Sequence, residues 1–336
     1  MSKRLGVRAG FGATPAEHQE VLQKVRIAEE LGVESIWTAE AWGRDAFTFL
    51  TELALITQRM GVGTSIVNVY SRSAGVLAMT AASIDELSGG RMILGLGSSG
   101  ANVIEHLHGV PFEKPLRRLR EYVEIINTLI AGQPLSYDGE IFQLKRGFTL
   151  RDFAPPRPHI PIYIAAITPA SIRQTGQIAD GIIPIYWPKE RLPQLVKSVR
   201  GAAEKAGRHA DAVTIALQVN LYISDASDAE AVRQRAKQPV AFYIGRMGRF
   251  YHEMLARNGY EAEVAASRAA WERRDASGAA AAVSERMLLA TTIAGTVEQC
   301  AAQLDERFDL GADLQLIPLP PGSASECGHI LERLLR

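Results

Sequence analysis

The chain has 336 residues, with 37 Lys and Arg against 37 Asp and Glu, so its formal net charge is zero at neutral pH. This balance argues against a generic binder of nucleic acid or acidic membrane, which needs a surplus of basic residues. The hydrophobic content of 47% is typical of a globular protein, and two cysteines are too few for a disulfide framework or a cysteine-rich metal cluster. No apolar stretch is long enough for a signal peptide or a membrane span, so we expect a cytoplasmic protein.

Short apolar runs alternate with helical segments through the first hundred residues. In the first helix, Thr14 is a good N-cap, Pro15 fits the first turn, Glu17 stands three residues after the cap, and Gly32 follows the end. Strand, helix and strand recur about every 30 residues, which indicates βαβ units and a parallel sheet. The expected helices are 14–31, 47–57, 73–87 and 117–131.

The expected strands number eight, which is the number that closes a (β/α)8 TIM barrel, although an open doubly wound α/β sheet remains an alternative. We expect one domain over residues 1–336. Residues 132–160 are rich in Pro and Gly and predict a loop with one hairpin, and 225–285 predict a helical insertion between strands seven and eight. The strands are 5–9, 34–38, 60–67, 91–96, 162–165, 181–185, 213–219 and 314–318.

The segment Gly95-Leu96-Gly97-Ser98-Ser99-Gly100 matches G-x-G-x-x-G after a predicted strand, which alone suggests a dinucleotide site. It lies in the fourth βα unit rather than the first, and no second strand with an acidic end follows at the required distance. We therefore do not favour a Rossmann dehydrogenase. Gly97, Ser98, Ser99 and Gly100 can still admit a flat ring or a phosphate close to the backbone.

The predicted strands end in a group of aromatic side chains, with few polar ones among them. Because active sites of barrels lie at the carboxyl ends of the strands, we expect a pocket for a planar organic ligand there. Any single aromatic residue of this set could instead merely cover the barrel. The expected pocket residues are Phe11, Trp42, Tyr70, Arg72, Tyr186 and Trp187.

Several short motifs together resemble those of the bacterial-luciferase-like oxidoreductases, over most of residues 5–320. Within that superfamily, the segments 39–46, 99–105 and 120–122 are most similar to the branch that uses the deazaflavin coenzyme F420. The motifs are Trp37-Thr38-Ala39-Glu40, Ser65-Ile66-Val67-Asn68, Leu87-Ser88-Gly89-Gly90-Arg91, Leu94-Gly95-Leu96-Gly97, Tyr163-Ile164-Ala165-Ala166 and Ile178-Ala179-Asp180-Gly181.

This resemblance implies a (β/α)8 barrel, commonly a homodimer, with the deazaflavin ring in the barrel mouth. It implies a cis peptide at Ser65-Ile66 that supports the ring from behind. By the same matching, Glu40, Asn68, Ser99 and Gly100 contact the ring or its side chain. The residues implied to hold the phosphate with backbone amides at the start of a helix are Ile167, Thr168, Ala170 and Ser171.

The chain departs from the sugar-phosphate dehydrogenases of this group. They carry His after the acidic residue of strand two and an acid after the second glycine of the strand-four motif, where this chain has Ala41 and Ala101. The usual Arg-His-Pro after strand three is Arg72-Ser73-Ala74 here, and the lysine near the end of strand six has no clear match. A glucose-phosphate substrate is therefore not expected.

In such an enzyme the cofactor carries the hydride and the protein orients it. Glu40 is the best carboxylate for proton donation, with a hydrogen bond to the ring as the alternative role. His106 and His108 stand two residues apart, so they face different ways on a helix and do not predict a metal pair. We expect no metal, because the chain also lacks a motif such as H-E-x-x-H.

The predicted insertion contains a basic stretch without Asp or Glu, formed by Arg233, Arg235, Lys237, Arg246 and Arg249. Arginine suits phosphate and carboxylate, so some of these side chains could meet the polyanionic tail of the deazaflavin coenzyme. A solvated helix face or a dimer contact is the alternative.

These observations favour an F420-dependent oxidoreductase that transfers a hydride between the deazaflavin and a small organic substrate at a CH–OH, C=C or C=N group. An FMN-dependent monooxygenase on the same barrel, which needs a reductase partner and oxygen, is the first alternative. A non-catalytic flavin-binding protein is the second.

Overall fold

The computed structural model describes residues 3–152 and 156–336. Part of the proline-rich run 154–158 and the first two residues of the chain lie outside this part. Within it, no helix combines the length and the apolar character that crossing a membrane requires.

Eight parallel strands form a closed barrel, because β1 pairs with both β2 and β13 and β3 pairs with β5. The predicted TIM barrel is confirmed, and an open doubly wound sheet is excluded by this closure. The order around the barrel is β1 (Leu5–Arg8), β2 (Ser35–Thr38), β3 (Gly61–Thr64), β5 (Met92–Gly97), β8 (Ile162–Ile164), β9 (Gly181–Ile182), β10 (Thr214–Gln218) and β13 (Leu314–Pro318).

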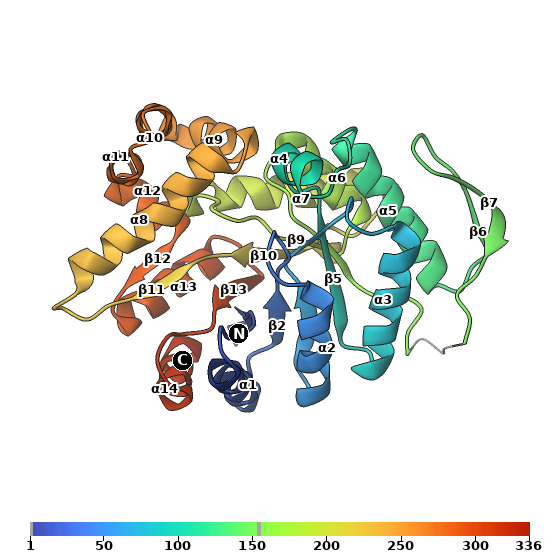
Figure 1. Cartoon of the computed structure of the whole chain (residues 1–336), viewed down its shortest axis with the longest axis horizontal. Coiled ribbons are helices and arrows are strands. Elements are labelled where there is room, and N and C mark those ends of the chain that lie inside the picture. Colours follow the sequence, from blue (N-terminus) through green and yellow to red (C-terminus); the bar gives the residue numbers. More distant parts are fainter. Residues whose placement is uncertain (1–2, 153–155) are drawn as a thin grey trace.

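Helices surround the barrel (Figure 1). The capping box predicted at Thr14 and Glu17 is present, and the four expected helices agree with the structure to within about three residues at each end. The short helix α4 (Ala101–His106) follows β5. The outer helices are α1 (Pro15–Glu30), α2 (Ala46–Ile56), α3 (Ala74–Leu87), α5 (Pro115–Ile130), α6 (Pro169–Ile178), α7 (Leu192–Lys205), α13 (Val297–Asp309) and α14 (Ala324–Leu335).

Two aromatic rings fill the inside of the barrel. Trp37 and Tyr163 lie with ring centroids 5.6 Å apart, and both are buried. Inward-facing glycines make room for them: a Cβ at Gly63 would lie 2.5 Å from the Trp37 ring, and one at Gly181 would lie 2.5 Å from the Tyr163 ring. The barrel is therefore a packed core, and the space for a ligand lies above it.

The third barrel strand is bulged where it approaches the mouth. β3 and the two-residue strand β4 (Val67–Asn68) pair with β5 in registers that differ by one residue, and the cis peptide Ser65–Ile66 implied by the resemblance lies between them. The Thr64 hydroxyl bridges the gap, since Oγ1 donates to the Gly95 carbonyl at 2.8 Å and accepts the Gly95 N–H at 2.9 Å.

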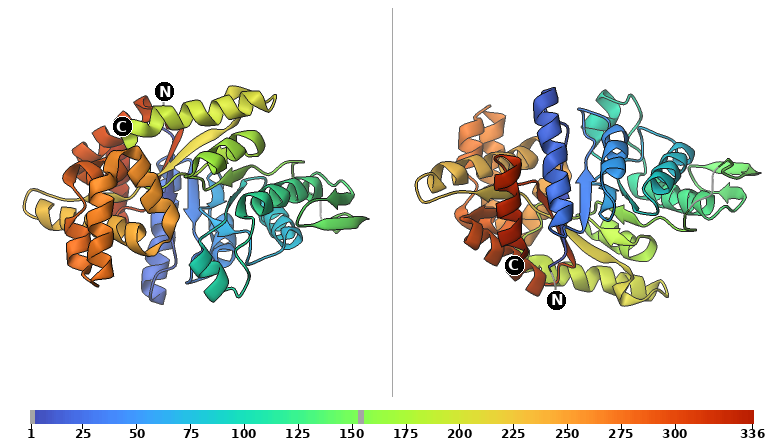
Figure 2. Two further views of the ribbon diagram at one scale, coloured as in Figure 1. Left: turned by 90° about the horizontal axis from the view of Figure 1, so that it is seen from above. Right: turned by 90° about the horizontal axis from the view of Figure 1, so that it is seen from below.

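Two segments leave the barrel plan. The expected hairpin is formed by β6 (Leu135–Asp138) and β7 (Gln143–Phe148), which project at the right of Figure 1. The stretch 225–285 is helical and lies at the opposite end of the molecule from the hairpin (Figure 2). Its first helix packs against the short parallel pair β11 (Leu221–Ile223) and β12 (Ile293–Gly295). Its helices are α8 (Ala229–Arg246), α9 (Arg249–Leu255), the π-helical η3 (Ala256–Tyr260), α10 (Glu261–Glu272) and α11 (Ala276–Ala281), followed by α12 (Glu285–Thr291).

Candidate active site

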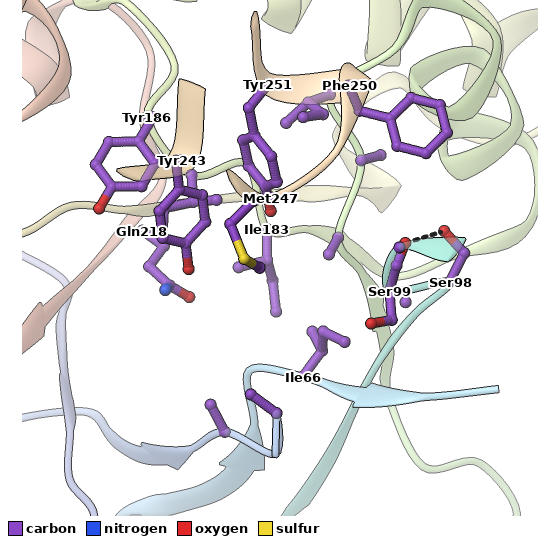
Figure 3. A pocket seen from close by; sticks show the side chains of 18 of the residues that line it. Ile66, Ser98, Ser99, Ile183, Tyr186, Gln218, Tyr243, Met247, Phe250 and Tyr251 are labelled. Carbon is purple, nitrogen blue, oxygen red and sulfur yellow. Dashed lines mark hydrogen bonds between the residues drawn. The ribbon is translucent and has the colours of Figure 1, made fainter. Parts of the chain in front are cut away.

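A cavity of about 720 Å³ opens at the carboxyl ends of the barrel strands (Figure 3). Helices α8 and α9 cover one side of it through Tyr243, Met247, Phe250 and Tyr251. The opposite side is formed by the ends of β2, β3, β5 and β8 and the start of α6. The cavity lies where barrel enzymes place their active sites, and its size suits a cofactor or a drug-sized ligand.

Most of the expected cofactor residues meet on one side of this cavity, which we call the β2–β8 wall. Trp42 lies at its edge and is 56% exposed. The expected cofactor residues that line the wall are Glu40, Ser65, Ile66, Gly97, Ser98, Ser99, Gly100, Ile167, Thr168 and Ser171.

The β2–β8 wall offers a flat ligand both space and hydrogen bonds. The Ser65 hydroxyl is buried and has no hydrogen-bond partner within the described residues. At Gly100 a Cβ would meet only the Met247 carbonyl at 3.9 Å, so the backbone there is open to a ligand. Ser99, directly before Gly100, has a φ of 57° and turns the chain at this point. An unpartnered hydroxyl beside open backbone fits a planar ring with polar edges.

The start of α6 is prepared to bind an anion. Thr168 and Ser171 form a capping box, in which Thr168 Oγ1 accepts the Ser171 N–H at 3.2 Å. Pro169 occupies the first turn, and the Ala170 N–H has no carbonyl to bond within the helix. Ala170 is exposed and does not line the cavity itself, but it lies between residues of the wall. A phosphate at this point would accept hydrogen bonds from backbone amides.

Glu40 is held by an arginine that lies behind the wall. Arg72 Nη1 and Nη2 donate to the two Glu40 carboxylate oxygens at 2.6 and 2.8 Å, and the Ala46 N–H donates to Oε2 at 3.1 Å. Arg72 also pairs with Asp45, and its hydrogen bond with Glu40 raises its pKa. Burial opposes the ionisation of Asp45, but hydrogen bonds from Thr48 and the charge of Arg72 outweigh it and lower the pKa of Asp45. Both Glu40 oxygens therefore already accept hydrogen bonds from the protein, and Oε1 can accept one more.

Several predicted residues lie outside the cavity. Phe11 packs on His18 and Phe49. The Asn68 amide closes a local turn, since its Oδ1 accepts the N–H groups of Tyr70 and Ser71.

Two further aromatic residues expected in the pocket, Tyr70 and Trp187, also lie outside it. The buried Tyr70 hydroxyl donates to the Glu113 carbonyl at 2.9 Å, and Trp187 is buried beside a second cavity. With Phe11 and Arg72, four of the six residues expected in the substrate pocket therefore do not line it, while Trp42 and Tyr186 do.

The other side of the cavity, which we call the tyrosine wall, was missed apart from Tyr186. The residues expected at the barrel mouth come from the first six predicted strands and the segments after them, whereas Gln218 and Asn220 lie at the end of the seventh, where they alternate with Val219. Sequence reasoning also overlooked the charge that ends the first strand. The residues that make this wall are Arg8, Tyr186, Gln218, Asn220, Tyr222, Tyr243 and Tyr251.

The tyrosines of this wall pack against one another, in one tilted and one edge-to-face pair, and stay protonated. The ring centroids of Tyr186 and Tyr243 lie 4.6 Å apart, and those of Tyr243 and Tyr251 lie 4.7 Å apart. Burial raises the pKa of all three phenols. Asn220 Nδ2 donates to Tyr186 Oη at 2.9 Å. At neutral pH these hydroxyls are therefore neutral hydrogen-bond donors.

A second, basic cavity of about 1110 Å³ adjoins the first at Ile167, next to the start of α6. Glu204 is the one acidic residue among its described lining. The cationic side chains that line it are Arg173, Arg191, Lys197, Arg200, Lys205 and Arg257.

The basic stretch of the insertion is divided by the structure. Arg249 lines the main cavity, whereas the Arg246 guanidinium lies 5.2 Å from the Trp271 ring centroid. Arg233 lies within 4 Å of Glu230 and Glu285, so acidic residues from outside the stretch reach it. Among the described residues, no three His, Cys, Asp or Glu side chains gather as a metal site would require.

The two histidines that follow the glycine motif do not line the cavity. His108 Nε2 lies 3.3 Å from the Asn68 amide nitrogen, and His106 ends α4.

Comparisons with known proteins agree with this geometry. The model of the luciferase-like monooxygenase family matches residues 5–314. A protein of Mycobacterium tuberculosis named as a coenzyme F420-dependent oxidoreductase is 33% identical over 76% of this chain and 78% of its own length. The 5,10-methylenetetrahydromethanopterin reductase of Archaeoglobus fulgidus is 30% identical over 91% of both chains. The structure of the coenzyme F420-dependent tetrahydromethanopterin reductase of Methanopyrus kandleri superposes with a TM-score of 0.81 at 22% identity, over 100% of this chain and 99% of that one.

Proposed function

This chain belongs to the luciferase-like monooxygenase family and is an oxidoreductase of that family, and we propose that it uses coenzyme F420 to transfer a hydride to or from a small organic substrate. The relatives named above support the cofactor, because each of two carries F420 in its name. The identity of the substrate is a separate question, because the Mycobacterium tuberculosis relative carries no substrate in its name.

The observation that carries this proposal is the position of the two cavities on either side of the α6 N-terminus. The β2–β8 wall can hold the deazaflavin ring, with the Ser65 hydroxyl as a hydrogen-bond partner. The free Ala170 amide at the start of α6 can donate to the phosphate, and the Thr168 and Ser171 amides can join it by exchanging their capping-box hydrogen bonds for bonds to the phosphate. Beyond them the basic cavity can accept an acidic tail, which F420 has and FMN lacks.

When bound, the deazaflavin supplies the hydride chemistry. The protein positions the ring: Ile66 on the bulge lies where it can support the ring, and α8 and α9 cover one side of the cavity. Both Glu40 oxygens already accept hydrogen bonds, which favours a role in orienting the ring over a role as proton donor.

Binding measurements with F420, FMN and NADH, each added alone, test this proposal. We expect F420 to bind with a dissociation constant that rises with salt, because its anionic tail meets basic residues. Binding of FMN without F420 would support the monooxygenase alternative. Binding of F420 without oxidation of its reduced form by any carbonyl, alkene or imine would support the non-catalytic alternative.

We further propose a homodimer that forms through α2 and α3. These two packed helices carry four exposed apolar side chains, namely Leu55, Val76, Met79 and Leu87. Such a patch is typical of an interaction surface. Light scattering on the purified protein should give twice the monomer mass, and Met79→Lys should give the monomer. Both cysteines are free and buried, which fits the expected cytoplasmic location.

A further inference from the structure

The tyrosine wall contains a cation without an acidic partner. Along β1, Gly6 faces the inside of the barrel, where a Cβ would lie 2.9 Å from Trp37 Nε1, so Arg8 two residues later also points inward. Arg8 Nη2 donates to the Val219 carbonyl at 3.1 Å and to Asn220 Oδ1 at 2.8 Å. Its Nε is buried and has no partner, and no carboxylate of the described residues lies within ion-pair distance.

Further hydrogen-bond donors line the same cavity as this cation. The hydroxyls of Tyr243 and Tyr251 point into the cavity and have no hydrogen-bond partner in the described chain (Figure 3). The Gln218 side chain, on the last residue of β10, reaches the same space and is likewise unpaired there. Burial lowers the pKa of Arg8 to about 10, so the guanidinium is still charged at neutral pH.

The opposite charge is missing from the cavity. Glu40 is the one carboxylate that lines it in the described part of the chain, and Arg72 binds both of its oxygens. Arg8 is thus desolvated by the protein without being neutralised. An arginine in this state is costly alone and is stabilised by a bound anion.

We propose that the tyrosine wall is the substrate-recognition site and that it binds the carboxylate of a small organic acid. Arg8 would bind the carboxylate through its fork of N–H groups, and the hydroxyls of Tyr243 and Tyr251 would donate to the same oxygens. The rest of the substrate is apolar, because Ile183, Met247 and Phe250 line the adjoining space. A single arginine with neutral donors suits the single charge of a carboxylate better than a phosphate.

This inference rests on the proposed function only in naming the ligand a substrate, since the anion site itself can be tested without the cofactor. Small aliphatic and aromatic carboxylates would each be titrated by calorimetry against the matching primary amide, near neutral pH, with and without F420. We expect each acid that binds to do so about tenfold more tightly than its amide, as charged hydrogen bonds imply. Tight binding of phosphate or sulfonate esters, or no preference for the acids, would overturn the proposal.

Variants then test whether the preference for acid over amide arises from the tyrosine wall. Arg8→Met should abolish the preference for acid over amide while F420 affinity stays within about twofold of the wild type. Arg246→Met, which removes the same charge outside the cavity, should keep the preference. Tyr243→Phe removes one donor without removing charge and should weaken acid binding about fivefold. A preference that survives in both Arg8→Met and Tyr243→Phe, or an Arg8→Met protein that loses F420 instead, would contradict the assignment.

One outcome is that F420 fails to bind the wild-type protein while the acids still bind more tightly than their amides and this preference still depends on Arg8. In that case the proposed cofactor is wrong and the anion site stands. If F420 binds and the acids show no preference, the reverse holds.

Discussion

The two walls of the cavity come from different parts of the fold and offer different chemistry. The β2–β8 wall is made of strand ends, backbone and small side chains, and its one carboxylate is neutralised by Arg72. The tyrosine wall is made by the end of β1, the segments that follow β9 and β10, β11 and the inserted helices α8 and α9, and it presents bulky phenols and an uncompensated cation. A cofactor shared across a family needs the first kind of surface. A substrate that varies between relatives is better read by the second, which the insertion can change without disturbing the barrel.

If this division is right, damage to the barrel side should affect the whole molecule. Gly95→Ala would place a Cβ 1.7 Å from the Thr64 carbonyl oxygen, and no side-chain rotation can relieve a clash with backbone. We expect a loss of roughly 3 kcal/mol or more in the free energy of unfolding, at the upper end for overpacking, measured by urea denaturation. Gly75→Ala on α3, where the nearest atom lies 3.9 Å away, should be neutral or slightly stabilising. Similar stability of the two variants would contradict the bulge as the rigid support of this wall.

Breaking the ion pair behind the β2–β8 wall, between Arg72 and Glu40, should cause the next largest loss of stability. Arg72→Leu leaves Glu40, whose side chain is 12% exposed, without its bidentate partner. Removing one member of a buried pair costs about 3 kcal/mol, and F420 affinity should fall with it, since Glu40 lines the cavity. Arg44→Leu is the matched control, because Arg44 is exposed and donates only to the Gly12 carbonyl. An Arg72→Leu protein as stable as the control would mean that the pair has no structural role.

The sequence predicted most residues of the β2–β8 wall but few of the tyrosine wall, and the difference has a physical reason. The βα periodicity and the ends of the second to fifth barrel strands are local features, so the positions of Glu40, Ser65 and Thr168 at the barrel mouth follow from the sequence alone. Tyr243 and Tyr251 belong to helices whose docking depends on long-range packing, and nothing in their local pattern points to the barrel mouth. Asn68 shows the opposite case, because the motif implied a contact with the ring, whereas Asn68 does not line the cavity and its Oδ1 accepts hydrogen bonds in a turn; that contact stays a prediction.

Removing one helix cap at a time should have a smaller effect, and it distinguishes the contribution of a cap to stability from its contribution to cofactor binding. Thr168→Ala removes the capping box of α6 and should cost about 1 kcal/mol of unfolding free energy, together with several-fold of F420 affinity. Thr14→Ala removes the equivalent box of α1, which does not line the cavity, and should cost the same stability while F420 affinity is unchanged. Denaturation and F420 fluorescence titration measure the two quantities. Equal losses of F420 affinity in both variants would show that the α6 N-terminus binds no phosphate.

The smallest effect is expected from Arg249, at the start of the inserted helix α9. Arg249 is exposed at the start of α9 and lines the cavity, whereas Arg246, three residues before it, stacks on Trp271. Arg249→Gln should weaken F420 binding about threefold at low ionic strength, since an exposed charge contributes roughly 0.2–1 kcal/mol, and the difference should disappear at about 0.5 M salt. Arg246→Gln should leave F420 affinity unchanged at either salt concentration. If both variants bind F420 like the wild type at low salt, the charge of Arg249 contributes nothing to cofactor binding, and the basic stretch of the insertion loses its proposed role.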